Sequence, residues 1–119
     1  MLKGPTIQDD LYTILLRFRL HPVAMTTDVT KMYRQIHLHE EDHDLHRVLW
    51  RSSPKETINE YRLKRLTFGT KAAPFLATRV LQQLAEDEKD NFPEAASVIL
   101  KYALKDDVMT GVESPTESI

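Results

Sequence analysis

The stretch from Asn59 to Asp90 constrains the fold most, because it combines a strand, a glycine turn and the longest helical pattern in the chain. "NEYRLKRLTF" (59–68) has the composition of a β-strand, and turn residues lie on both sides of it, in "SPKET" (53–57) and at Gly69. After Gly69, "KAAPFLATRVLQQLAEDEKD" (71–90) repeats apolar residues at helical spacing, and Pro74 suits a first helical turn. The apolar stripe expected on this helix comprises Ala73, Phe75, Leu76, Val80, Leu81 and Leu84.

The other segments alternate between helix and strand patterns. We expect a helix over 7–20, a strand over 23–29 ending near Asp28, a turn or short helix over 31–35, a short strand over 34–39, and a strand over 46–52 that forms a hairpin with 59–68. The segment "EAASVILKYAL" (94–104) suits a helix, a strand, or one passing into the other. This order predicts the α+β class with a mainly antiparallel sheet.

Composition excludes several kinds of site. The sequence has no cysteine, which excludes disulfides, thiolate metal ligands and cysteine nucleophiles. It has no run of about 18 apolar residues, so we expect no membrane partner. The net charge is −2, yet residues 47–65 are mainly basic and the sequence from Glu86 onward is mainly acidic. We expect an intracellular protein, cytoplasmic or nuclear, whose charge pattern is either ordinary surface charge or a phosphate-facing side.

Four histidines lie among acidic residues in "HLHEEDHDLH" (37–46). A metal site is one interpretation of this segment. The histidines lack the fixed spacing of zinc motifs, however, so a histidine-rich polar loop is the preferred interpretation.

The aspartates offer a second candidate site. Asp28 ends a strand that is expected to be buried, where a carboxylate is costly unless it binds something. Asp106 and Asp107 adjoin a second β-like segment. Carboxylates that meet at strand ends form a hard-oxygen site suited to Mg²⁺, and a pair of such ions can bridge an attacking hydroxyl and a leaving phosphate. The alternative is that these acids are simply solvated at strand ends.

Three motifs, in order, resemble the palm motifs of reverse transcriptases. "MTTDVTKMYRQIHLHEED" (25–42) resembles the first, "YRLKRLTFGTKAAPFLATRVLQQLA" (61–85) the second, and "DDVMTG" (106–111) the third. "GPTIQDDLYTILLRFRLH" (4–21) and "DLHRVLWR" (44–51) are most similar to the BEL/Pao group of LTR retrotransposons. The resemblance covers the chain from Gly4 to Gly111 and implies an RNA-directed DNA polymerase palm with part of the fingers.

The resemblance implies roles for individual residues. Asp28, the carbonyl of Val29, Asp106 and Asp107 would hold two Mg²⁺ ions, with Mn²⁺ as an alternative. Tyr33 would lie beneath the incoming sugar and exclude a 2′-hydroxyl. The implied partners are an RNA or DNA template–primer and deoxynucleoside triphosphates. The residues implied to lie near nucleotide and template are Gln35, Phe68, Gly69 and Lys71, of which Gly69 would permit a close backbone approach.

The third motif departs from the family's Tyr-x-Asp-Asp pattern. Leu104 holds the tyrosine position and Lys105 the variable one, and leucine cannot donate a hydrogen bond. If segment 94–104 is extended, Tyr102 shares a face with Leu104 and Asp106. If it is a helix that continues to the aspartates, the carboxylates lie at the negative end of the helix dipole, which is a poor geometry for a metal site.

We expect residues 1–119 to be a partial reverse transcriptase domain without thumb or ribonuclease H, inactive as an isolated chain, with a flexible tail over 112–119. A palm without those parts would expose apolar surface or self-associate, with Leu38, Trp50, Phe68 and Val108–Met109 as candidates. Two alternatives remain open. The chain is either a domesticated retroelement remnant that serves as a non-catalytic binding or scaffold protein, or an unrelated α+β binding module that uses the basic segment 47–65.

Overall fold

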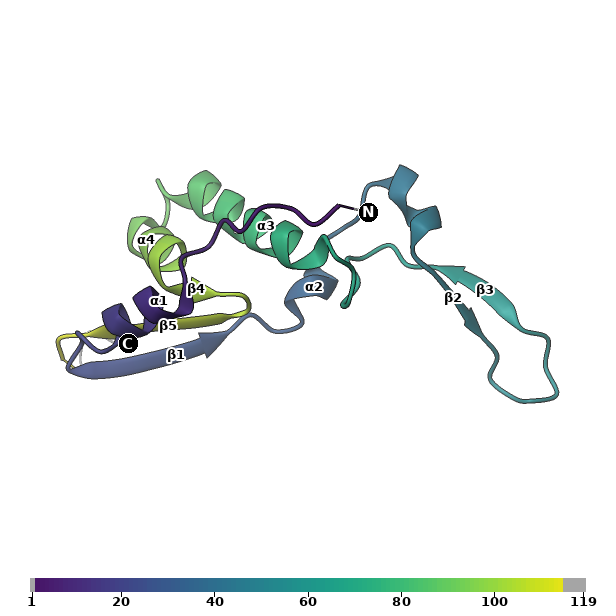
Figure 1. Cartoon of the computed structure of the whole chain (residues 1–119), viewed down its shortest axis with the longest axis horizontal. Helices are drawn as coiled ribbons and strands as arrows, with labels where there is room; N and C mark the ends of the chain where they lie inside the picture. The colour runs from purple at the N-terminus through teal and green to yellow at the C-terminus, as the bar shows by residue number, and fades with distance from the viewer. Residues whose placement is uncertain (1, 115–119) are drawn as a thin grey trace.

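The computed structural model describes residues 2–114 and has mixed α and β structure with antiparallel sheets, which confirms the α+β class (Figure 1). The elements in chain order are α1 (Leu11–Phe18), β1 (Val23–Asp28), α2 (Met32–Gln35), the 3₁₀ helix η1 (Glu40–Leu45), β2 (Arg47–Trp50), β3 (Asn59–Arg62), α3 (Ala73–Glu88), α4 (Pro93–Tyr102), β4 (Ala103–Leu104) and β5 (Asp107–Val112). No helix among the described residues is long and apolar enough to cross a membrane.

A three-stranded sheet in the order β1-β5-β4 forms one end of the molecule. β1 and β5 pair along their whole length, from Val23 opposite Val112 to Asp28 opposite Asp107. Helices α1 and α4 pack against β5 and against each other, and both lie on the same side of the sheet (Figure 1). Val108 faces these helices and is buried, while Ala24, Thr26 and Asp28 alternate onto the other side of β1 and are exposed. We call this second side the open face of the sheet.

The start of α1 shows how the sequence fixes a helix end. The Thr13 amide and hydroxyl both donate to the Asp10 carboxylate, at 3.0 and 2.8 Å, and these bonds hold the pKa of Asp10 below its usual value. Asp10 is therefore the N-cap, and the helix is shorter at both ends than the expected span 7–20.

The core is centred on α2 and α3 rather than on the sheet. The largest buried cluster joins Met32 and Tyr33 of α2 to Leu66 and to one face of α3. That face carries Ala73, Ala77, Leu81 and Ala85, spaced four residues apart, and the small alanines let the backbones of neighbouring segments approach closely. The expected stripe was therefore partly wrong, because Leu76, Val80 and Leu84 are exposed. α3 packs on α4 and α2. This differs from the packing that the palm resemblance implies, in which the helix would lie across the sheet that carries Asp28 and Asp106.

Residues 34–39 do not form the expected strand. Arg34 and Gln35 belong to α2, and the only β-pairing in this segment is an isolated bridge between His37 and Arg65. The backbone bonds from Leu38 to Lys64 and from Leu66 to Ile36 hold the two segments together without a regular ladder. The acidic loop that follows folds as η1, which leads to the buried His46.

β2 and β3 form the expected hairpin, with shorter strands than predicted, and it projects from the end of the molecule remote from the three-stranded sheet (Figure 1). The molecule is accordingly elongated, with extents of 60 × 30 × 29 Å. Every residue of both strands is exposed. Of the residues expected to form an exposed apolar surface, Trp50 and Phe68 are exposed and Leu38 and Met109 half-buried, whereas Val108 is buried beneath the helices. Of the expected tail, Val112 pairs with Val23 in the sheet, and residues 115–119 lie outside the described part.

Gly111 allows the β1–β5 pairing, and its replacement tests the register. A Cβ atom at Gly111 would meet the side chain of His21 and the carbonyl oxygen of Val23. We predict that Gly111→Ala lowers the free energy of unfolding by about 1–3 kcal/mol, the usual cost of overpacking. Urea unfolding measures this, with the exposed Thr26→Ala on β1 as a control that costs less. Equal midpoints for Gly111→Ala and the parent would contradict the register.

Candidate metal and nucleotide site

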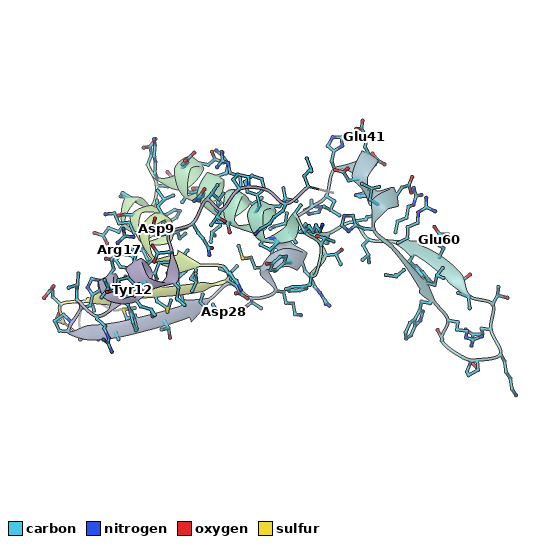
Figure 2. The ribbon with its side chains drawn as sticks, in the orientation of Figure 1. Asp9, Tyr12, Arg17, Asp28, Glu41 and Glu60 are labelled. Atoms are coloured by element: carbon cyan, nitrogen blue, oxygen red, sulfur yellow. The ribbon has the colours of Figure 1, made fainter. Side chains whose placement is uncertain are left out.

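Two of the three predicted aspartates lie directly opposite each other. Asp28 is the last residue of β1 and Asp107 the first of β5, and the register pairs them. Cα atoms of such antiparallel partners are about 4.5–5.5 Å apart and their side chains share a face, here the open face. Figure 2 shows Asp28 at the end of β1, away from α1. Residues separated by most of the chain are thus brought together at one end of the sheet.

Asp106 is held beside them by the β4–β5 turn. Leu104 pairs with Asp107, so Lys105 and Asp106 form the loop between them, and Lys105 adopts a positive φ of 58°. Positive φ is typical of such short hairpin loops. The Val29 amide donates to the carbonyl oxygen of Asp106 at 2.8 Å, which joins the turn to the end of β1. The backbone therefore holds Asp28, Val29, Asp106 and Asp107 as one group.

The helix before the aspartates does not reach them. α4 ends at Tyr102, and the two residues of β4 separate it from the turn. Of the alternatives for segment 94–104, the helix passing into a strand is therefore correct. The aspartates consequently do not lie at the negative end of the helix dipole. Tyr102 is not on the aspartate side, because its hydroxyl shares a 3.2 Å hydrogen bond with His21 Nε2. Neither Leu104 nor Tyr102 brings a hydroxyl to the aspartates.

The N-terminal segment positions this end of α4, which sequence reasoning missed. Arg17 donates to the carbonyl oxygen of Lys101 at 3.0 Å and pairs with Asp9, as Figure 2 shows. The Lys105 amide donates to Gln8 Oε1 at 3.3 Å. The helical pattern of residues 7–20 signalled a buried face but gave no sign of the contacts of Arg17 with Lys101 and of Gln8 with Lys105, because these partners lie more than 80 positions away.

Tyr33 lies between the core and the aspartates. Burial of the phenol, and then the negative charge of Asp106, raise the pKa of Tyr33 above its usual value. The ring also contacts Phe68, with centroids 4.3 Å apart and planes tilted by 39°. Tyr33 is thus both a residue of the buried core and a neighbour of Asp106. Phe68 itself is exposed.

The other predicted residues follow Tyr33 in α2 or lie in the turn before α3. The Gln35 side chain donates to the Thr30 carbonyl oxygen at 3.3 Å. Gly69 has a φ of 83° with open space where a Cβ would stand, so its conformation rather than crowding requires glycine. Gly69 and the exposed Lys71 form the turn that leads from Phe68 into α3, and no contact joins either residue to the aspartates within the described chain.

A basic hollow adjoins Phe68, and sequence reasoning had not singled it out. It measures about 310 Å³ and is lined by residues 63–68 together with Arg34. Its lining is mainly apolar and includes the three cations Arg34, Lys64 and Arg65. The Arg65 guanidinium donates to the carbonyl oxygen of Gln35 at 3.4 Å. The signal was the stretch "LKRL" (63–66), whose two cations follow the strand β3. Three cations beside an exposed aromatic ring suit a phosphate with an attached base.

The donor set fits partial ligation of a metal. Among the described residues, no group of three or more histidine, aspartate or glutamate side chains is arranged to hold a metal ion. Asp28 and Asp107 are exposed and Asp106 is half-buried. Mg²⁺ is commonly bound by one or two carboxylates with waters and substrate phosphates rather than by a complete protein cage. The aspartates match that incomplete kind of site.

No protein-family model matches this sequence, and no curated protein matches it. The family resemblance therefore stays a prediction from the three motifs.

The environment of Tyr33 can be tested by alkaline titration. We predict that Tyr33 ionises above pH ~10, the usual range of a tyrosine. Tyr33→Phe should remove this late component from the ultraviolet difference spectrum. Asp106→Asn should lower the pKa of Tyr33 only in part, because burial is the larger cause. Since the raised pKa favours the neutral phenol, its stabilising effect is complete below pH ~10 and is lost as pH rises through the folded-state pKa.

A spectrum of Asp106→Asn identical to that of the parent would contradict the closeness of Asp106 to Tyr33. Asp90→Asn is the matched control, since Asp90 lies at the end of α3 and should leave the titration unchanged.

Proposed function

We propose that this chain is the palm region of an RNA-directed DNA polymerase, similar to those of BEL/Pao retrotransposons, and that it uses two-metal nucleotidyl transfer. The observation that carries the proposal is the pairing of Asp28 with Asp107 beside the bond from Val29 to Asp106. The first and third motifs, about 80 residues apart in the sequence, meet at one sheet end, as that chemistry requires.

The aspartate pairing has a cost that a cation would offset. Like charges directly opposite each other on paired strands are destabilising. Asp28 and Asp107 lie in that relation, with Asp106 adjacent. A divalent ion between them would turn the repulsion into attraction, which favours a binding role over solvated acids. When bound, Mg²⁺ supplies charge stabilisation for the primer hydroxyl and the leaving phosphate.

The residues around the aspartates have matching proposed roles. Tyr33 offers a rigid ring beside Asp106, where it would lie beneath the sugar of the incoming deoxynucleotide. Phe68 continues this surface by contact with Tyr33 and could stack on a base. Gln35 and the turn through Gly69 and Lys71 would bound the nucleotide, with the basic hollow beyond Phe68 available for phosphate.

A second candidate function is that of a domesticated, non-catalytic binding or scaffold protein. It is favoured by the exposure of Asp28 and Asp107 and by the leucine at position 104, which leaves no hydroxyl beside the turn. Metal affinity distinguishes the two functions, because a scaffold gains nothing from the paired carboxylates.

Metal binding is the direct test of the site. We predict that Mn²⁺, detected by electron paramagnetic resonance, binds the chain and is displaced by Mg²⁺. Asp28→Asn and Asp106→Asn should each weaken binding at least about tenfold, the lower bound for losing even an outer-shell partner. In the presence of a chelator Asp28→Asn should also raise the urea midpoint, because it removes the repulsion with Asp107.

Asp90→Asn is the matched control and should change neither the affinity nor the urea midpoint. Mn²⁺ affinities that are equal in all four proteins would overturn the metal site and leave the scaffold function.

We also predict that the isolated 119-residue chain does not extend a primer with Mg²⁺ and deoxynucleotides supplied. Within the described residues both sheet-packing helices lie on the side away from Asp28 and Asp107, so nothing opposite the open face holds a primer end in line. A displacement of about 1 Å already costs on the order of a hundredfold in rate. Extension that disappears in both Asp28→Asn and Asp106→Asn would contradict this prediction.

A further inference from the structure

The β2–β3 hairpin presents an apolar face that nothing in the described chain covers. Val48 pairs with Tyr61 and Trp50 with Asn59, so these side chains share one face, on which Val48, Trp50 and Tyr61 are 41%, 62% and 50% exposed. The opposite face carries Arg47, Glu60 and Arg62, tied to one another and to Asp44 by ion pairs, together with the exposed Leu49. Two-stranded hairpins are marginally stable without a partner, and an apolar face of this kind marks an interaction surface.

A second uncovered apolar surface lies where α3 meets α4. A hollow of about 190 Å³ is lined there by Leu84, Phe92, Ala95 and Ile99, with Glu88 at its side. Leu84 and Phe92 are 52% and 62% exposed. The hollow is smaller than the ~300–1,000 Å³ of ordinary small-molecule pockets. It therefore suits one inserted side chain better than a bound ligand.

The two surfaces have opposite charge. Apart from the ion-paired Arg47, Glu60 and Arg62, residues 47–62 of the hairpin carry Arg51 and Lys55 against Glu56, whereas residues 82–95 around the hollow contain five acidic residues and one lysine. They lie at opposite ends of the elongated molecule (Figure 1). A hairpin therefore cannot reach the hollow of its own chain, but it can reach that of another copy.

We propose that the chain self-associates head to tail, with the apolar face of one hairpin, centred on Trp50, seated in the α3–α4 hollow of a second copy. Opposite charges favour this contact, whereas two hairpins placed face to face would bring like charges together. A nucleic acid is less favoured on the hairpin, because Arg47 and Arg62 are already paired with Asp44 and Glu60. Such a heterologous contact leaves one free surface of each kind at the ends of an oligomer.

Sedimentation velocity with single-surface variants tests the proposal. The parent should exceed its monomer mass of 13.8 kDa as concentration rises, and return to it at high ionic strength. Trp50→Thr removes the indole side chain that would enter the hollow. Ala95→Arg fills the hollow and repels the basic hairpin. Each variant alone should stay monomeric, yet a mixture of the two should form a dimer, because each retains the surface that the other lacks. Tyr12→Ser, at an exposed position of α1 outside both surfaces, is the control and should associate like the parent.

Other outcomes overturn the proposal. A parent that is monomeric at every concentration excludes self-association, and a mixture that stays monomeric while the parent associates excludes the head-to-tail geometry. Binding of a single-stranded oligonucleotide that Trp50→Thr abolishes, with the parent remaining monomeric, would assign the hairpin to nucleic acid instead. Circular dichroism of each variant separates these outcomes from misfolding. Arg51→Glu leaves the apolar face intact but reverses a charge of the hairpin, so it should weaken association. Association of Arg51→Glu equal to that of the parent would contradict the charge complementarity.

Discussion

The antiparallel pairing of β1 with β5 is the constraint on which the candidate site depends. It spans Val23 to Asp28 on one strand and Asp107 to Val112 on the other, and Gly111 leaves room for His21 within it. A shift of one residue would turn Val108 away from the helices and move Asp107 out of line with Asp28. Burial of Val108 beneath α1 and α4 therefore fixes the position of the carboxylates, even though they are themselves exposed.

Much of the fold could be predicted because its signals are local. The strand ending at Asp28, the hairpin and the helix after Gly69 each follow from residue spacing within a single segment. The end of α4 could not be predicted, since "VILKYAL" satisfies both periods and only pairing with β5 makes Ala103–Leu104 a strand. Residues 34–39 alternate like a strand but meet only one bridge partner. The apolar pattern of α3 correctly predicted a helix. Its buried side depends on the packing of α2 and α4, which contact the face of Ala73, Ala77 and Ala85 and leave Leu76, Val80 and Leu84 exposed.

The site residues divide in the same way. The meeting of Asp28 with the Asp106–Asp107 pair was expected from the motifs, and the polar contacts of Gln8 and Arg17 were not, because such contacts leave no periodic trace in a sequence. Tyr33 shows that a core residue can also lie near the aspartates: it belongs to the α2–α3 core, and the charge of Asp106 contributes to its raised pKa. The open face of the sheet, the paired carboxylates and the basic hollow are the observations behind the proposal of a polymerase palm. The exposed aspartates and Leu104 support the scaffold alternative.

The central claim is geometric: Asp28 and Asp107 face each other across the β1–β5 pair. The chain has no cysteine, so a double variant, Asp28→Cys with Asp107→Cys, can be tested for a single intramolecular disulfide under mild oxidation. Opposed antiparallel residues fall within the Cα separations of about 4.4–6.8 Å that a disulfide accepts. The account predicts rapid, complete crosslinking of this pair, detected by mass spectrometry, and little crosslinking of Asp28→Cys with Glu94→Cys at the start of α4. Failure of the first pair to crosslink, or equal crosslinking of both, would contradict it.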